Sequence, residues 1–152
     1  MSALKARIAD DMKAALLGRH RFRGDVLRSL KAAILNEEVS LGKRDEGLSD
    51  AEVEKVIARE VKKRKEGAEL YRANGRAELA EPEEKEAAIL QEYLPEQLSE
   101  DEIRVMVEAA VADLGATMQQ MGQVIGAVKA KAGNAADGAL IAKITKEILA
   151  KQ

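Results

Sequence analysis

Hydrophobic residues recur every three or four positions along almost the entire chain, the spacing that places them on one face of an α-helix. Leu4, Ile8, Met12 and Leu16 give the first example. No stretch shows the strict alternation of apolar and polar residues that predicts a β-strand. The pattern therefore predicts an all-α protein, with helices that begin near residues 2, 24, 49, 82, 100, 118 and 138.

Three of the predicted helix starts carry a capping box. In this motif a Ser or Thr side chain accepts a hydrogen bond from the backbone three residues on, and a Glu or Gln there reaches back to the Ser or Thr amide. Glycines that follow the apolar series predict helix ends, since glycine readily adopts the left-handed conformation found there. The three boxes are Ser49–Glu52, Ser99–Glu102 and Thr117–Gln120.

Two connections and two helix ends complete the predicted arrangement. The basic segment 19–23 follows Gly18 and is expected to connect the first two helices. Pro82 is expected in the first turn of the fourth helix, where a missing amide hydrogen costs little. Tyr71 and Leu114 extend the apolar series of their helices, so both are expected to face inward.

A domain boundary is predicted at Leu94–Pro95, because proline biases the preceding residue away from helical angles. Ser99 then begins a new helix. Sequence before this point is rich in charged residues, and sequence after it is richer in alanine. We therefore expect an N-terminal bundle of about four helices in residues 1–95 and a small three-helix bundle in residues 96–152.

The amino-acid composition limits the kinds of chemical site that the protein can contain. The chain has 152 residues, of which 46% are hydrophobic, and it contains no cysteine and one histidine, His20. Disulfides and thiolate chemistry are excluded, a metal site is disfavoured, and a cytoplasmic location is expected. No apolar run approaches the roughly 20 residues that span a bilayer, so no membrane association is expected. No cofactor is implied.

The small net charge of −2 hides an uneven distribution. Residues 1–65 hold 16 Lys+Arg against 11 Asp+Glu, whereas residues 66–95 hold 3 against 8 and residues 96–152 hold 6 against 8. The basic first part can attract phosphate groups. A solvated helical surface of mixed charge is the alternative interpretation.

Gly122 and Gly126 lie one turn apart inside a predicted helix, where each costs about 1 kcal/mol relative to alanine. Lys129 continues the same face. One interpretation is close packing of this face against a neighbouring helix. The other is a smooth surface that approaches a nucleic-acid backbone, with Lys129 and Lys131 binding phosphate.

Lys62, Lys63, Arg64 and Lys65 form the densest positive run. Four consecutive helical residues point in different directions around the axis, so they do not make one flat patch. Pairing with Glu60, Glu66 and Glu69 at four-residue spacing is one expectation for this run, and contact with RNA is the other. Arg64 is in line with apolar residues and can anchor helix packing.

No pattern typical of an active site is present. There is no Gly-x-Ser-x-Gly turn, no glycine-rich phosphate loop between strand and helix, and no carboxylate pair that stands apart from the amphipathic helices. No catalytic residue is predicted. Phe22, Tyr71 and Tyr93 are the only aromatic residues, so any RNA binding is expected to use phosphates and shape rather than stacked bases.

Several segments together resemble the GatB/YqeY family in its free-standing, YqeY-like form. Each is short, and their order and spacing over nearly the whole chain make the resemblance specific. The segments are 27–34 (LRSLKAAI), 60–66 (EVKKRKE), 75–76 (GR), 79–81 (LAE), 92–99 (EYLPEQLS), 121–126 (MGQVIG) and 137–138 (DG).

The resemblance implies a two-domain, all-α protein. Its C-terminal part is similar to the tail of the B subunit of aspartyl/glutamyl-tRNA amidotransferase, which is implicated in holding tRNA while other domains perform the amidation. We therefore expect a non-catalytic tRNA-binding or amidotransferase-associated module, with tRNA and an amidotransferase or tRNA synthetase complex as partners. The expected RNA-binding residues are Gly122, Gly126, Lys129, Lys131, Lys62, Lys63, Arg64 and Lys65.

Two other functions stay open. A helical protein-interaction adaptor would use the acidic segment 66–95 to dock a basic partner. A carbon–nitrogen ligase with glutamine as amide donor is the enzymatic activity that the family suggests, although the chain lacks room for the ATP-using domain that this chemistry needs.

Overall fold

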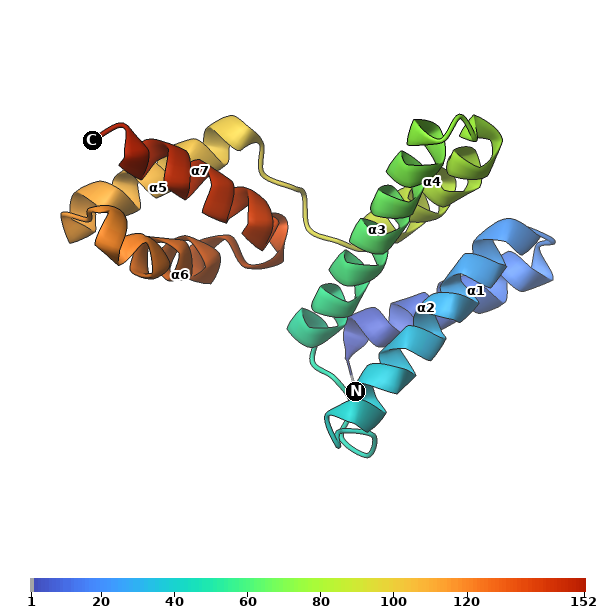
Figure 1. Ribbon diagram of the computed structural model, residues 1–152. Coiled ribbons are helices and arrows are strands. Elements are labelled where there is room, and N and C mark those ends of the chain that lie inside the picture. The colour runs from blue at the N-terminus through green and yellow to red at the C-terminus, as the bar shows by residue number, and fades with distance from the viewer. Residues whose placement is uncertain (1) are drawn as a thin grey trace. The chain divides into compact units, whose positions relative to one another are not determined.

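The computed structural model describes residues 2–152, and its regular structure over these residues is entirely helical (Figure 1). The prediction of an all-α protein is confirmed. Two short 3₁₀ turns, Met118–Gln120 and Gly133–Ala135, flank the sixth helix. The helices are α1 (Ala3–Leu17), α2 (Arg21–Ser40), α3 (Asp50–Ala73), α4 (Ala77–Gln91), α5 (Glu100–Leu114), α6 (Met121–Ala132) and α7 (Gly138–Ala150).

Contacts divide the chain into two compact units, one ending at Leu94 and one comprising Pro95–Gln152. In the first unit, α3 packs mainly against α4, and α1 packs mainly against α2. In the second unit, each of α5, α6 and α7 contacts the other two. The first unit therefore consists of two helix pairs that are joined to each other, whereas the second is one group of three helices.

Each unit has its own apolar core. Ile8, Leu30 and Ile57 are among the fully buried side chains of the first, and Ile103 and Ile141 are among those of the second. The inward positions predicted from helical spacing are mostly buried. Two are not: Tyr71 is 38% exposed and Leu114 is 47% exposed. Both lie in the last turn of a helix.

The capping boxes at Ser49 and Ser99 are confirmed. The Ser49 hydroxyl accepts from the Glu52 amide at 3.2 Å, and the Glu52 carboxylate accepts from the Ser49 amide at 3.0 Å. The Ser99–Glu102 box has the same two bonds. At Thr117, the amide and the hydroxyl both donate to the side-chain oxygen of Gln120, so this motif closes the 3₁₀ turn ahead of α6.

Helix α2 begins at Arg21, three residues before the predicted start at Gly24. Gly24 is buried inside the helix, where an added Cβ would lie 2.5 Å from Cδ2 of Leu16. The glycine thus lets α1 and α2 approach closely, and this packing offsets its low helix propensity. The predicted connector 19–23 is accordingly wrong beyond His20, because Arg21–Arg23 form the first turn of α2.

Helix α4 begins at Ala77, five residues before the predicted start, and Pro82 lies inside it. Amides of Leu79 and Ala80 donate to the Arg76 carbonyl, at 3.0 and 3.3 Å, and Ala80 is fully buried. Burial of Ala80 favours the early start. Pro82 cannot donate a helical hydrogen bond to the Glu78 carbonyl, and its ring crowds that carbonyl, yet the helix continues past it to Gln91.

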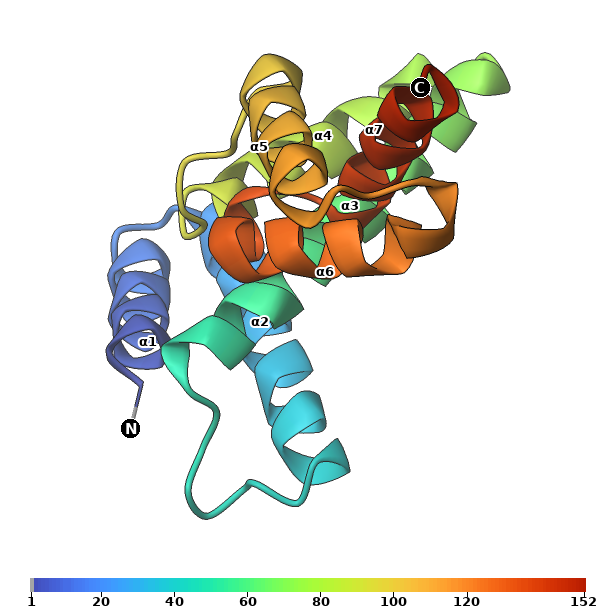
Figure 2. The same ribbon diagram turned by 90° about the vertical axis from the view of Figure 1, so that its left-hand side faces the viewer.

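A buried carboxylate ties three parts of the first unit together. Glu38 on α2 is 1% exposed and accepts from Nζ of Lys5 on α1 at 2.7 Å and from the Leu48 amide at 3.2 Å. These hydrogen bonds, the one from Lys5 foremost, lower the pKa of Glu38. The long connection between α2 and α3, seen best in Figure 2, is thereby attached to the helices.

Polar contacts anchor the chain on both sides of the division between the units. The Tyr93 hydroxyl donates to Oδ2 of Asp11 at 2.5 Å, within the first unit. Burial, helped by this bond to Asp11, raises the pKa of Tyr93 to about 12, so the hydroxyl stays a donor at neutral pH. In the second unit, the Leu98 amide donates to the Ala135 carbonyl at 2.8 Å.

Candidate nucleic-acid interface

The glycine face of α6 is open within the second unit. Gly122 and Gly126 are both exposed, and a Cβ built on either one meets no heavy atom within 4 Å. Close packing against α5 or α7, one of the two interpretations of these glycines, is therefore not what the second unit shows. On the opposite side of α6, Val124 and Val128 are buried in the core.

Helix α6 carries charge of one sign. It contains no Asp or Glu, and its last turn holds Lys129 and Lys131, both exposed. Lys129 lies three residues after Gly126 and so continues the glycine face. Lys131 is in line with Val124 and Val128 at helical spacing, so it lies almost opposite. The structure thus joins Lys129, but not Lys131, to the glycines.

The Lys129 side chain extends along the surface towards α7. A Cβ built on Gly138, the first residue of α7, would lie 2.9 Å from Cε and 3.1 Å from Nζ of Lys129. No carboxylate among the described residues lies within ion-pair distance of this ammonium group. Its positive charge is thus available to an anion approaching α6.

In the first unit, the basic run on α3 separates into two kinds of residue. Lys62, Lys63 and Lys65 are exposed and form no ion pair among the described residues. Arg64 has 12% of its side chain exposed and contacts Glu60 on its own helix at 3.0 Å and Glu86 on α4 at 3.3 Å. Arg64 therefore joins α3 to α4.

The expected i,i+4 pairs on α3 form only at Arg64–Glu60. Within residues 2–152, no ion pair connects Lys62 to Glu66 or Lys65 to Glu69. Long surface side chains gain little from such pairs after the loss of side-chain entropy, which explains their absence. Three lysines are left with free ammonium groups on this surface.

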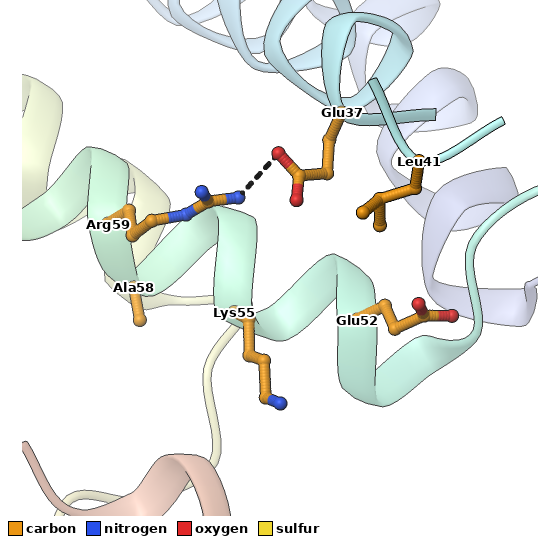
Figure 3. A pocket seen from close by; sticks show the side chains of 6 residues that line it. All are labelled: Glu37, Leu41, Glu52, Lys55, Ala58 and Arg59. Atoms are coloured by element: carbon orange, nitrogen blue, oxygen red, sulfur yellow. Dashed lines mark ion pairs between the residues drawn. The ribbon is translucent and has the colours of Figure 1, made fainter. Parts of the chain in front are cut away.

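A hollow between α2 and α3 has a volume of about 440 Å³ (Figure 3). Its lining includes Glu37, Glu52 and Arg59, and the Arg59 guanidinium contacts the Glu37 carboxylate at 2.9 Å. The Glu52 carboxylate accepts from Lys43 at 2.7 Å, and this hydrogen bond, with a second from the Ser49 amide, lowers its pKa to about 2. The Glu52 carboxylate is therefore held ionised by its partners, and the Glu37 carboxylate is occupied by an ion pair, which suits stabilisation of the fold rather than proton transfer.

Basic residues gather around a hollow beside the turn between α1 and α2, a grouping that was not predicted from the sequence. Arg19, Arg21 and Arg28 line one hollow there together with Leu16. The available signal was compositional, since residues 12–35 hold six basic residues and only one acidic residue, Asp25. It was overlooked because arginines in a short connector are commonly solvated.

Two further features bear on the choice of chemistry. Within the part of the chain that the structure describes, no three His, Cys, Asp or Glu side chains come together as metal ligands would. Across the same residues, no helix combines the length and apolar character needed to traverse a bilayer. His20 precedes α2 and makes no side-chain capping bond.

The family model for YqeY-like proteins matches residues 5–149. The chain belongs to the YqeY-like family. This match covers both units, including α6 and the basic run on α3.

Several curated proteins are similar to parts of this chain. "Altered inheritance of mitochondria protein 41, mitochondrial" of Clavispora lusitaniae is 30% identical over 92 residues, 60% of this chain and 52% of the relative. The protein of that name in Lachancea thermotolerans is 28% identical over 111 residues, 72% and 58% of the two chains. "Uncharacterized protein C22F3.15" of Schizosaccharomyces pombe is 29% identical over 98 residues, 64% and 74%. The chain thus spans about half the length of the first relatives.

Proposed function

We propose that this YqeY-like protein is a non-catalytic module that binds the phosphate backbone of tRNA through the glycine face of α6. One observation carries the proposal: Gly122 and Gly126 are exposed with open space above them, on a helix that has no acidic side chain. Each glycine weakens the helix, and within the second unit no packing contact offsets that cost. The close approach of a ligand's backbone would explain why glycines occupy these two positions.

The chemistry of this face favours phosphate. A helix surface without side chains admits a sugar–phosphate backbone, and Lys129 at its end supplies a cation. The second unit contains no aromatic residue on which a base could stack, so recognition would use shape and charge. Lys62, Lys63 and Lys65 in the first unit are the proposed additional contacts. Arg64 is held in ion pairs and contributes mainly to the fold.

The proposal extends to a partner and a compartment. An amidotransferase or a tRNA synthetase complex is the proposed protein context of the bound tRNA. The cytoplasm remains the expected compartment for this chain, although two of the relatives have mitochondrial names. Carbon–nitrogen ligase activity requires ATP- and glutamine-dependent turnover, which the purified chain is expected not to show.

The primary test is a titration of the full-length protein with tRNA at low and higher salt. Each phosphate contact releases counterions, so affinity should fall steeply between about 50 mM and 200 mM salt. Lys129→Glu should weaken binding and reduce the slope of log affinity against log salt by about 1. Lys131→Glu makes the same charge change on the other side of α6 and should have a smaller effect. Equal effects of the two substitutions would contradict the glycine face as the interface.

A second test separates stability from binding. Gly122→Ala/Gly126→Ala adds two methyl groups where there is room for them, so it should raise the stability of α6 by about 1 kcal/mol per residue. The same methyl groups would keep an RNA backbone at a distance, so tRNA affinity should fall several-fold. Gly67→Ala is the matched control, because Gly67 also lies inside a helix and an added Cβ there would have only an ordinary contact, 3.8 Å from Glu83. Unchanged affinity in the double variant would refute close backbone approach.

Protein docking is the second candidate function. Leu35 and Val39 lie one turn apart on α2 and are 44% and 59% exposed. The acidic segment 66–95 is less available than its composition indicates, because Glu84 and Glu86 form ion pairs with Arg72 and Arg64. Absence of tRNA binding at low salt, together with a partner lost on Leu35→Glu/Val39→Glu, would favour this candidate.

A further inference from the structure

The turn that joins α1 to α2 places an arginine at a left-handed position, which glycine usually fills at the end of a helix. The His20 amide donates to the Ala15 carbonyl at 2.8 Å, and the Arg19 amide donates to the Leu16 carbonyl at 3.4 Å. These two bonds define a Schellman motif, whose left-handed position is usually glycine. Arg19 occupies that position with φ 62°, and it is the sole non-glycine residue with positive φ among residues 2–152.

Beside this turn lies a hollow of about 570 Å³, lined by Leu16, Arg19, Arg21 and Arg28. Three of these four residues are arginines, and none is acidic. Leu16 is fixed by its close packing on Gly24, where α1 meets α2. The hollow thus combines a firmly packed apolar side chain with guanidinium groups from the turn and from α2. The turn joins the blue helices α1 and α2 in Figure 1.

The positive charge at this turn is only partly balanced. Arg23 is neutralised by the Glu92 carboxylate, 2.6 Å away, and it does not line the hollow. Arg28 lies 3.8 Å from Asp25, one turn back on the same exposed surface. Arg19 and Arg21 have no ion pair among the described residues. At least two guanidinium groups beside the hollow therefore lack a counter-charge.

We propose that Arg19, Arg21 and Arg28 form a phosphate-binding site. Planar guanidinium groups donate paired hydrogen bonds that match the oxygens of a phosphate group, and they remain charged at every physiological pH. The site lies in the first unit, so it is separate from the glycine face of α6. The phosphate comes either from an RNA backbone or from a small phosphate-bearing molecule. In the first case the site adds a contact to the proposed function, and in the second it is independent of it.

The site is tested with inorganic pyrophosphate as the probe, titrated into the full-length protein at low salt. Arg21→Gln/Arg28→Gln should weaken pyrophosphate binding by about tenfold, because charged hydrogen bonds to two guanidinium groups are lost. Arg19→Gly should weaken it too while leaving the melting temperature unchanged or raised, because glycine adopts the left-handed conformation without strain. Arg44→Gln is the control, since Arg44 is an exposed arginine beyond the other end of α2.

Competition with tRNA identifies the source of the phosphate. Displacement of pyrophosphate by tRNA, with weaker tRNA binding in the arginine variants, assigns the site to an RNA backbone. Pyrophosphate binding that the variants lose but tRNA does not displace assigns it to a small molecule. The site is refuted if the arginine variants change neither pyrophosphate nor tRNA binding, or if Arg44→Gln has an equal effect. Lys129→Glu changes tRNA binding alone, so failure of the proposed function is distinguishable from failure of this site.

Discussion

Different interactions stabilise the first unit and the second unit internally. Buried residues of the apolar core make up a similar share of each, 13 residues in the first unit and 8 in the smaller second unit. Ion pairs are distributed otherwise: among the described residues, ten lie in the first unit and one, Arg104–Glu147, lies in the second. Apolar packing of three short helices evidently needs little help from charge.

In the first unit, ion pairs connect helices that also pack against one another. Lys5–Glu38 joins α1 to α2, Arg59–Glu37 joins α3 to α2, and Arg64 and Arg72 join α3 to α4. Each such pair restrains how one helix lies against the next. Because the ion pairs are concentrated there, changes of pH and salt should affect the first unit before the second. All three aromatic residues also lie there, so tyrosine fluorescence reports this unit alone, whereas far-ultraviolet circular dichroism reports both.

The largest effect is expected from Lys5→Met. This change leaves the buried Glu38 carboxylate with the Leu48 amide as its remaining partner, and an unpaired buried charge costs about 3 kcal/mol of unfolding free energy. Denaturant unfolding followed by tyrosine fluorescence measures the loss. Lys13→Met makes the same change at an exposed position of α1 and should be nearly neutral. Similar stabilities for the two variants would show that the Lys5–Glu38 pair is dispensable.

Acid should destabilise the first unit before the second. Glu38 and Glu52 have pKa values lowered by their hydrogen bonds to Lys5 and Lys43, that of Glu52 from 4.5 to about 2. Because protonation is easier in the unfolded chain, the stability that Glu52 gives is complete above about pH 4.5 and is lost as pH falls towards 2. The stability that Glu38 gives is lost in the same direction, as its carboxylate becomes protonated.

Stability curves at pH 6 and pH 3 check this expectation. The unfolding free energy of the first unit, followed by tyrosine fluorescence, should fall between these two pH values. The fall should be larger than that of the second unit, followed by backbone amide exchange at Val124 and Val128. Glu52→Gln should flatten the pH dependence of the first unit. An equal loss in both units would contradict the assignment of charge-based stabilisation to the first.

The smallest effect concerns helix ends. In the second unit, glycines hold the left-handed positions after α5 and α6, at Gly115 and Gly133, whereas Arg19 does so after α1. Arg19→Gly should therefore raise the stability of the first unit, by about 0.5–1 kcal/mol after allowing for the greater freedom of glycine in the unfolded chain. Arg21→Gly, two residues away in the first turn of α2, should lower it by a similar amount. A loss of stability on Arg19→Gly would show that the arginine serves the fold rather than a ligand.

Local signals in the sequence predicted local structure well. The Ser49 and Ser99 boxes and the turn at Gly133 depend on neighbours within a few residues, and each is present in the structure. The starts of α2 and α4 were misplaced because Gly24 and Pro82 usually mark helix ends. Burial against other elements overrode both preferences.

The candidate site was less accessible to sequence reasoning. Spacing placed Gly122, Gly126 and Lys129 on one face, but whether that face was packed or open depended on where α5 and α7 lie. The same holds for Arg64, because Glu86 is distant in sequence and approaches only when α4 packs on α3. The arginine hollow requires the left-handed turn at Arg19, which no residue type in that segment predicts.

The anchors on either side of Leu94–Pro95 have a consequence for avidity. Tyr93 is tied to Asp11 and Leu98 to Ala135, so few residues connect one folded unit to the other. Once one unit holds an RNA phosphate, a short tether keeps the other at an effective concentration on the order of millimolar for any site within its reach. Weak phosphate contacts in the two units can then add up to a useful affinity. Lengthening the segment between Leu94 and Gln97 would dilute that effect while leaving the Tyr93–Asp11 and Leu98–Ala135 hydrogen bonds in place.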